Sequence, residues 1–206
     1  LVRRGWSHGD QEFFTRDELI AKFSLEHIGK SAGVFDPQKL LALNADHIKA
    51  ASVETLAVHL KPFLSARGVD NPDPDYLGAA IETLQTRSKT LLEMAEGALF
   101  YFQPEVVYEE KAAHKFFKPA ALEPIRFLIA QLDAQRGFND ASIEAAFVQT
   151  MEKTGLKLGK IAQPVRVALT GKTVSPGIFE IIRVLGREKT LARLRKAADT
   201  IAARGA

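Results

Sequence analysis

Two glycine–lysine pairs offer the first candidate chemistry, because a glycine-rich loop that ends in Gly-Lys-Ser/Thr cradles phosphates with its backbone amides. Residues 29–31 (Gly-Lys-Ser) and 171–173 (Gly-Lys-Thr) both end in this way. The phosphate-binding loop also needs a glycine five residues before the pair, where this chain has Ser24 and Arg166. Both matches therefore fail, and we interpret each glycine as a turn residue beside a lysine.

No catalytic or metal site follows from the remaining polar residues. The 5 histidines lack the spacing of zinc ligands, and the chain has 0 cysteines, which excludes a thiol nucleophile, a thiolate metal site and a disulfide scaffold. Asp73 and Asp75 flank Pro74, a pattern typical of a turn. From these residues alone we expect no catalytic group and no metal.

Charge is distributed unevenly along the chain, although its formal net charge is only +3. Residues 151–206 contain 12 lysines and arginines against 4 acidic residues, whereas residues 1–150 contain 16 basic and 21 acidic residues. A basic lobe of this kind attracts polyanions and steers their approach. A solvated helical surface would produce the same pattern, so charge alone leaves the two interpretations open.

Helix-capping signals recur and set the elements that must position any site. Thr15 and Glu18 form a capping box, in which a hydroxyl and a carboxylate each satisfy a free amide. Asp36, which a proline follows, predicts a cap and a first helical residue. Asn44 and Ser52 precede further helical stretches. The chain therefore begins as a series of short helices.

The later part of the chain continues in the same manner. We expect helices over residues 74–87, 88–102, 109–117, 120–135 and 140–154. In the last helix, the inward stripe is Leu191, Leu194, Ala198 and Ile201, and a different face carries Lys189, Arg193, Lys196 and Arg204. Alternating strand patterns and hairpin turns are missing from the sequence, so an all-α fold is predicted.

Composition places the chain among ordinary globular proteins. Its hydrophobic fraction of 46 % is enough to offset the entropy of ordering, so disorder is not expected. We find no apolar run of the roughly 18–20 residues that span a bilayer and no signal peptide. The chain starts with leucine rather than methionine, which suggests part of a longer protein. A cytoplasmic protein without membrane contact is the expectation.

Two longer stretches resemble a known family. The first comprises residues 6–12 (Trp-Ser-His-Gly-Asp-Gln-Glu) with residues 32–40. The second comprises residues 155–171 and continues through residues 175–188. Together they closely resemble the C-terminal half of bacterial glutamyl-tRNA synthetases, and the resemblance covers essentially the whole chain.

The resemblance implies a stem-contact helical remainder at 1–51 and two helical anticodon-binding domains at 52–108 and 109–206. It implies tRNA(Glu) as partner and a monomer. In that family a separate N-terminal nucleotide-binding fold uses ATP and Mg²⁺ to activate glutamate and transfer it to tRNA. This chain would carry no cofactor of its own, and its work would be to recognise the anticodon and position the tRNA.

By the same resemblance, Arg87 matches the position that reads the third anticodon base, a cytosine. A planar guanidinium suits this task because it stacks on a base or pairs with an acceptor edge. A shift of two residues in the alignment would put Lys89 there instead. An arginine at this position favours charging of glutamate tRNA alone. Without the resemblance, Arg87 would be interpreted as a solvated arginine at a helix end.

Further positions match the family's contacts with the first two anticodon bases: Arg166, Ser175, Pro176 and Ile178. Ser175 is a candidate helix cap and Pro176 a candidate first helical residue, which would turn amides toward the partner. Capping and core packing are the alternative for Pro176 and Ile178. General attraction of phosphates is assigned to Lys157, Lys160, Lys172, Arg183 and Arg187.

Two other function classes remain open at this point. An all-helical protein-interaction module could use the basic lobe to dock an acidic partner, and it would not respond to anticodon sequence. An independently catalytic chain would need an ATP site, and the failed phosphate-loop matches argue against one.

Overall fold

The computed structural model describes residues 5–29 and 35–205, and its regular structure is helical. The α-helices and two short 3-10 helices (η) are α1 Arg16–Lys22, η1 Leu25–His27, α2 Pro37–Ala50, α3 Val53–Ser65, α4 Pro74–Leu84, α5 Leu91–Phe102, α6 Glu110–Phe116, η2 Pro119–Ala121, α7 Leu122–Ala134, α8 Asp140–Thr154, α9 Leu158–Thr170 and α10 Ile178–Gly205. Over the described ranges no strand forms, and Trp6 and Ile28 make an isolated β-bridge. The all-α prediction is confirmed.

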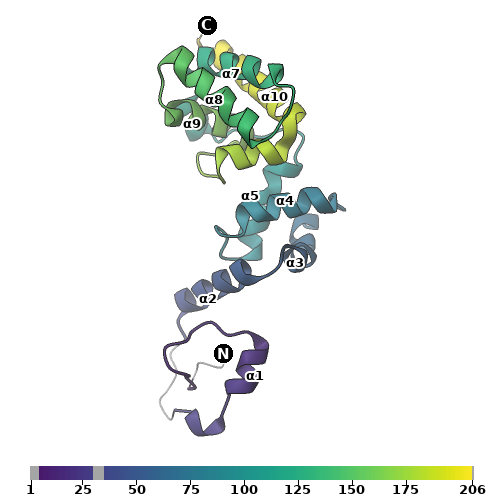
Figure 1. The fold of residues 1–206 in the computed structure, drawn as a ribbon, viewed down its shortest axis with the longest axis vertical. Helices are drawn as coiled ribbons and strands as arrows, with labels where there is room; N and C mark the ends of the chain where they lie inside the picture. The colour runs from purple at the N-terminus through teal and green to yellow at the C-terminus, as the bar shows by residue number, and fades with distance from the viewer. Residues whose placement is uncertain (1–4, 30–34, 206) are drawn as a thin grey trace.

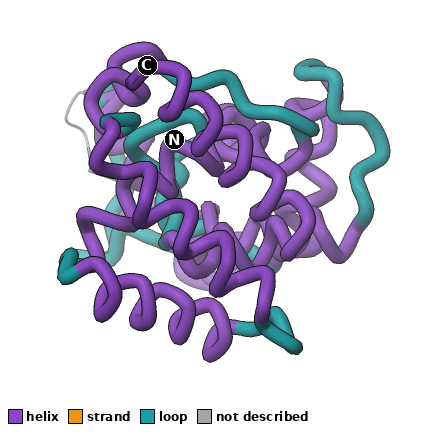
Figure 2. The backbone as a smooth tube through the Cα atoms, turned by 90° about the horizontal axis from the view of Figure 1, so that it is seen from above, coloured by secondary structure: helices purple, strands orange, loops and turns teal. Residues whose placement is uncertain are grey.

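The helices are arranged along one long axis (Figure 1). α1 lies near the N-terminal end, α2 leads to a group formed by α3, α4 and α5, and α6 to α10 gather at the opposite end. Seen from above in Figure 2, helices make up most of the backbone, with loops at their ends. α10 bends at Gly186, whose φ of 74° lies in the left-handed region that glycine tolerates.

A single hydrophobic core runs through the two groups, from Ile48 to Ile201. In the first group, α3 packs against α4 and α5; in the second, α10 packs against α7 and α9. Leu60 and Leu64 follow each other on one face of α3 and are fully buried. Burial of each such leucine contributes about 1.5–3 kcal/mol. This continuous core fixes where the loops between helices can lie.

The N-terminal region has its own small aromatic cluster. Trp6 is 3 % exposed and lies against Phe14 and Phe23, with ring centroids 5.7 Å and 5.8 Å away. Phe13 packs on His47 of α2 at 4.6 Å, which connects this cluster to the rest of the chain. Lys30 and Ser31 of the first Gly-Lys-Ser motif, and residues 32–34 of the first resemblance stretch, lie outside the described residues.

Most of the capping predictions are confirmed. The Thr15–Glu18 box forms with bonds of 3.2 Å and 2.8 Å, and Asp36 and Ser52 cap α2 and α3. The helix start expected after Asn44 is wrong, because that residue lies inside α2. The side-chain amide of Asn44 instead donates from Nδ2 to the carbonyl of Lys89.

Helix ends deviate by a few residues where a better cap competes. α4 ends at Leu84 rather than near residue 87, and α5 begins at Leu91 because the Thr90 hydroxyl caps it. The helix expected over residues 140–154 forms as α8, and Asn139 caps it. The shortening of α4 and α5 leaves residues 85–90 as a loop, and this loop carries Arg87.

Candidate functional site

Two arginines from different parts of the chain converge on one serine. Arg87, in the loop between α4 and α5, donates from Nη1 to the carbonyl of Ser175 at 3.0 Å. Arg166, on α9, donates from Nη1 to the same carbonyl at 3.2 Å, to the Ser175 hydroxyl, and to the carbonyl of Pro176 at 2.6 Å. The structure therefore brings together four of the predicted residues, although Arg87 and Arg166 are 79 positions apart in the sequence.

The two arginines give this cluster a concentrated positive charge. No described carboxylate forms a salt bridge with either guanidinium, so two positive charges share neutral oxygen acceptors. Burial, and then the charge of Arg87, hold the pKa of Arg166 below its ordinary value. Like charges held near one oxygen raise the local positive potential, which favours an approaching phosphate or an acceptor edge of a base.

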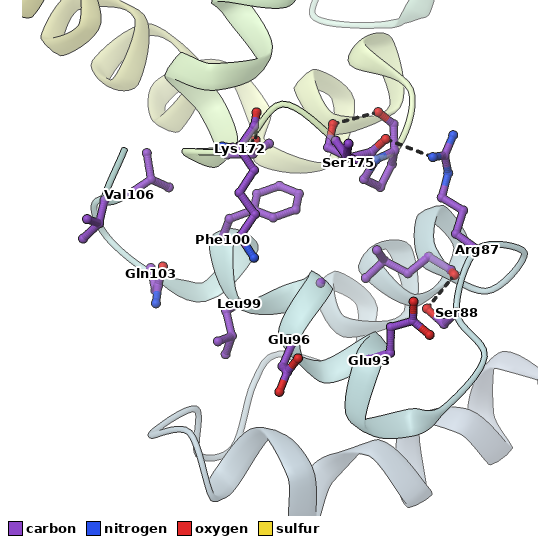
Figure 3. A pocket seen from close by; sticks show the side chains of 16 residues that line it. Arg87, Ser88, Glu93, Glu96, Leu99, Phe100, Gln103, Val106, Lys172 and Ser175 are labelled. Atoms are coloured by element: carbon purple, nitrogen blue, oxygen red, sulfur yellow. Dashed lines mark hydrogen bonds between the residues drawn. The ribbon is translucent and has the colours of Figure 1, made fainter. Parts of the chain in front are cut away.

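A groove of about 410 Å³ opens beside the cluster, between α5 and the loop that joins α9 to α10 (Figure 3). Arg87 and Ser175 lie at one side of it, and Lys172 also lines it. Its apolar lining includes Val107 and Val174, which are 90 % and 80 % exposed. An open apolar wall beside guanidinium donors is suited to a flat ring that also carries hydrogen-bonding edges.

Acidic residues also line this groove, and each has a protein partner. Glu93 accepts from the backbone amide of Lys89 at 2.8 Å, which fixes the loop that carries Arg87. Glu96 pairs with Arg67 at 2.9 Å. Both carboxylates are bound by residues on the α3–α5 side, and neither forms a salt bridge with Arg87.

Gly171 determines how the α9–α10 loop leaves its helix. It ends α9 with φ 77°, and a Cβ on it would lie 2.2 Å from the carbonyl oxygen of Val107. Its own carbonyl accepts from the amide of Glu109 at 2.9 Å. The loop that carries Ser175 is thus held against residues 107–109 by a contact that only glycine permits.

The loop that carries Arg87 is held from the other side by α2. Gln85 donates from its side-chain amide to the carbonyls of Ile48, Lys49 and Ala51 at 2.8–3.1 Å, and these belong to the C-terminal end of α2. The alternative candidate Lys89 is exposed and is not part of the groove lining.

The predicted role of the Ser175 and Pro176 backbone is wrong. α10 begins at Ile178, and Gly177 takes the capping position, where its amide donates to the carboxylate of Glu180 at 3.0 Å. The carbonyls of Ser175 and Pro176, rather than amides, face the guanidiniums, because Arg166 binds them. Ile178 is 6 % exposed and packs in the core, so its side chain is placed to support the loop and not to present itself to a partner.

The five basic residues assigned to phosphate attraction have different surroundings. Lys157, Lys160 and Lys172 are exposed. Arg183 is also exposed and lies 3.7 Å from Asp140. Arg187 is half-buried, and its guanidinium donates to four carbonyls at the end of α7 and just beyond it, with distances of 2.5–3.3 Å. These contacts hold that helix end, and the attraction of phosphates by Arg187 stays a prediction.

Sequence reasoning missed Arg193. The expectation that it lies on the polar face of the last helix is wrong, since it is 4 % exposed. The buried face of the helix is wider than the predicted stripe, since Thr190 and Ala197, about one turn before and after Arg193, are also buried. The apolar Ala197 was the available sequence signal for this wider face.

Two kinds of function find no support in the described parts of the chain. Residues 5–29 and 35–205 contain no group of histidine, aspartate and glutamate side chains that could hold a metal ion. None of the helices there has both the length and the apolar character that a membrane crossing requires.

Comparison with known proteins gives a consistent family. Residues 55–198 match the family described as "Anticodon binding domain". The chain is 57 % identical over 201 residues to a glutamate–tRNA ligase of Desulfosudis oleivorans, covering 98 % of this chain and 43 % of the relative. It is 55 % identical over 197 residues to that of Syntrophobacter fumaroxidans, covering 96 % and 42 %. The chain thus spans less than half the length of these relatives.

Solved structures agree on the fold. A glutamate–tRNA synthetase from Elizabethkingia anophelis superposes with a TM-score of 0.81 at 25 % identity, over 96 % of this chain and 39 % of the other. A glutamate tRNA ligase from Elizabethkingia meningosepticum, solved in complex with its amino acid, gives a TM-score of 0.86 at 24 % identity, over 97 % and 39 %.

Proposed function

The chain belongs to the anticodon-binding domain family, and we propose that it is the part of a glutamate–tRNA ligase that recognises the anticodon of tRNA(Glu). The observation that carries the proposal is the convergence of Arg87 and Arg166 on Ser175 at the edge of the groove. Sequence-specific recognition of RNA targets single-stranded bases whose edges are exposed. A groove with apolar walls and unneutralised guanidiniums supplies both stacking and donors.

Arg87 reads the third anticodon base in this proposal. Its guanidinium is exposed and its bond to the Ser175 carbonyl is a single contact, so a base edge can replace that carbonyl at small cost. A cytosine presents acceptors at O2 and N3 on its pairing edge, and a guanidinium fork can donate to both. The exchange gives up one hydrogen bond to a neutral carbonyl and forms two to the base.

Arg166, Ser175 and Pro176 serve the first two bases. Arg166 is half-buried and holds its Nη1 on the serine hydroxyl and both carbonyls, so it fixes the loop rather than moving freely. Ile178 supports the same loop from the core. The exposed lysines Lys157, Lys160 and Lys172, with Arg183, add sequence-independent attraction of phosphates.

The wider assignments follow from the family. We assign residues 1–51 to a stem-contact region and residues 52–108 and 109–206 to two helical anticodon-binding domains of a monomeric cytoplasmic enzyme. Activation of glutamate with ATP and Mg²⁺ belongs to the rest of such an enzyme. The described side chains do not fit a metal–nucleotide site, since both glycine–lysine pairs lack the upstream glycine.

The test is binding of the chain to tRNA(Glu) transcripts that differ at single anticodon positions. We expect a change of the third base to weaken binding about 5- to 150-fold, which corresponds to the 1–3 kcal/mol of a bidentate base contact. Arg87→Gln should abolish that discrimination. Lys89→Gln is the matched control, because it removes one positive charge from the same loop and should weaken binding of all transcripts equally.

Two results would contradict the proposal. Equal affinity for all anticodon variants would favour a protein-interaction module with a basic lobe. Loss of discrimination in Lys89→Gln alone would move the base-reading role from Arg87 to Lys89. Measurement at two salt concentrations separates the readout of bases from attraction of phosphates, since only the latter falls steeply with salt.

A further inference from the structure

We propose that Arg193 is a positioning residue for anticodon recognition, because it connects the C-terminal ends of α5 and α9. Arg87 lies in the loop that precedes α5, and Arg166 lies on α9. The proposal rests on the function proposed above. It assigns a specific task to a buried arginine that does not itself line the groove.

Arg193 bridges two helix ends. Its Nη1 donates to the carbonyl of Leu169 at 2.6 Å, in the last turn of α9. Its Nη2 donates to the carbonyls of Phe100 and Gln103 at 2.7 Å and 2.6 Å, in the last turn of α5 and just beyond it. One side chain of α10 thus satisfies carbonyls that helix ends leave without intrahelical partners.

Helix ends replace a carboxylate as the counter-charge. Arg193 forms no salt bridge with a described acidic residue, although it is 4 % exposed, and burial of an unpaired guanidinium is costly. Each helix C-terminus carries roughly half a negative charge, so two of them supply about one. Both helix ends must therefore be present, and in one relative position, for the guanidinium to be accommodated.

Lys189, one turn before Arg193 on α10, reinforces the same joint. Its Nζ donates to the carbonyl of Tyr101 at 3.1 Å and lies 3.3 Å from the hydroxyl of Tyr76. The Tyr76 hydroxyl donates to the same Tyr101 carbonyl at 2.9 Å. The end of α5 is therefore held by two cations of α10 and by one phenol of α4.

A small rotation at this joint, where Arg193 holds the ends of α5 and α9, would move the far end of α5 by a larger distance. Arg87 lies just before Leu91, the first residue of α5, and Phe100 is nine residues further along, about 13 Å at 1.5 Å per residue. A tilt of about 10° at the joint would move the start of α5 by about 2 Å over this length. Arg166 is only one turn from Leu169, so it would hardly move. Arg87 and Arg166 could then no longer both bind the Ser175 carbonyl, because a shift of about 2 Å is more than a hydrogen bond tolerates.

The first experiment measures the geometry directly. The chain has 0 cysteines, so paired cysteines at the exposed positions Lys61 on α3 and Glu144 on α8 can carry spin labels. We expect a narrow distribution of the distance between the two labels in the chain with Arg193 intact. In Arg193→Met the distribution should be broadened or shifted by at least about 2 Å. Arg195→Gln is the matched control, because Arg195 is an exposed arginine of the same helix that pairs with Asp133 inside the second group.

The second experiment links geometry to recognition. Arg193→Met should reduce third-base discrimination at least fivefold, whereas Arg195→Gln should lower affinity for all anticodon variants alike. A merely structural role would lower stability while the folded fraction kept its discrimination and its label distance, and that result would refute the proposal. If Arg193→Met does not fold, Arg193→Lys keeps the charge but cannot reach three carbonyls, and the same outcomes apply to it.

The two proposals fail in different ways. If the unaltered chain binds all anticodon variants equally, the proposed function fails, while the label distances still test the joint. If discrimination is present but insensitive to Arg193→Lys and to Lys189→Gln, recognition stands and the positioning role is refuted.

Discussion

Replacement of Gly171 by alanine tests how the loop of the candidate site is held. Gly171 ends α9 with φ 77°, and its missing Cβ would lie 2.2 Å from the carbonyl oxygen of Val107. Contacts below 3.0 Å do not persist, so residues 107–109 must retreat by about 0.8 Å. That movement strains the bond of 2.9 Å from the amide of Glu109 to the Gly171 carbonyl.

The size of the effect can be worked from these contacts. An alanine in the left-handed region costs about 1–2 kcal/mol. Displacement of a packed segment costs about 1–3 kcal/mol more. We expect Gly171→Ala to lower the free energy of unfolding by about 2–5 kcal/mol in total, as the sum of these two effects.

Gly155 provides a matched control in the same chain. It ends α8 with φ 67°, so it shares the backbone conformation of Gly171, but a Cβ on it would meet nothing within 4 Å. Gly155→Ala should therefore cost only the conformational part, about 1–2 kcal/mol. The assay is urea unfolding followed by circular dichroism. Equal losses in the two variants would refute the argument that the close approach of Val107 fixes the loop.

Two further outcomes follow from buried groups. Arg187→Met should lower the free energy of unfolding by about 2–3 kcal/mol, since hydrogen bonds from a charged donor are worth about 1.5–3 kcal/mol. Arg183→Met is the control in the same urea assay. It breaks only an exposed pair and should cost less than about 1 kcal/mol. Burial raises the pKa of all 3 tyrosines, Tyr76, Tyr101 and Tyr108, above the ordinary 10.0. The folded chain then binds these protons more tightly than the unfolded chain, so stability is full below about pH 10 and falls as the pH rises further. Phenolate absorbance and helical dichroism should change together, and phenolate formation in a chain that stays helical would contradict this.

Local signals were sufficient for the helices that depend on neighbouring residues. The Thr15–Glu18 box and the caps Asp36 and Ser52 involve partners three or fewer residues away, and all three were predicted. Asn44 has the same side-chain chemistry as a cap, yet its amide binds the carbonyl of Lys89, 45 residues away. A residue type alone cannot distinguish these two uses.

The candidate site shows the same limit. Resemblance to a family selected Arg87, Arg166 and Ser175, but capping rules gave Ser175 the wrong local role, because its carbonyl and hydroxyl are bound by guanidiniums from outside its own helix. Arg193 was misplaced for a related reason: an arginine on an apolar stripe is normally assigned to the surface. Its burial is possible only because the C-terminal ends of α5 and α9 lie beside it and their carbonyls accept its hydrogen bonds.

Four arginines share a feature that determines how much positive charge this surface carries. Arg87, Arg166, Arg187 and Arg193 all donate to backbone carbonyls, and none is paired with a described carboxylate. A carboxylate would fix a guanidinium equally well, but it would cancel the charge. The carbonyls of Ser175 and Pro176 lie outside any helix, so they fix Arg87 and Arg166 without a counter-charge, whereas Arg187 and Arg193 bind helix ends whose partial negative charge offsets theirs. In residues 151–206, Arg183, Arg195 and Lys196 pair with carboxylates of other segments. The positive charge that remains for a phosphate backbone therefore comes from Arg166 and from the exposed lysines Lys157, Lys160 and Lys172.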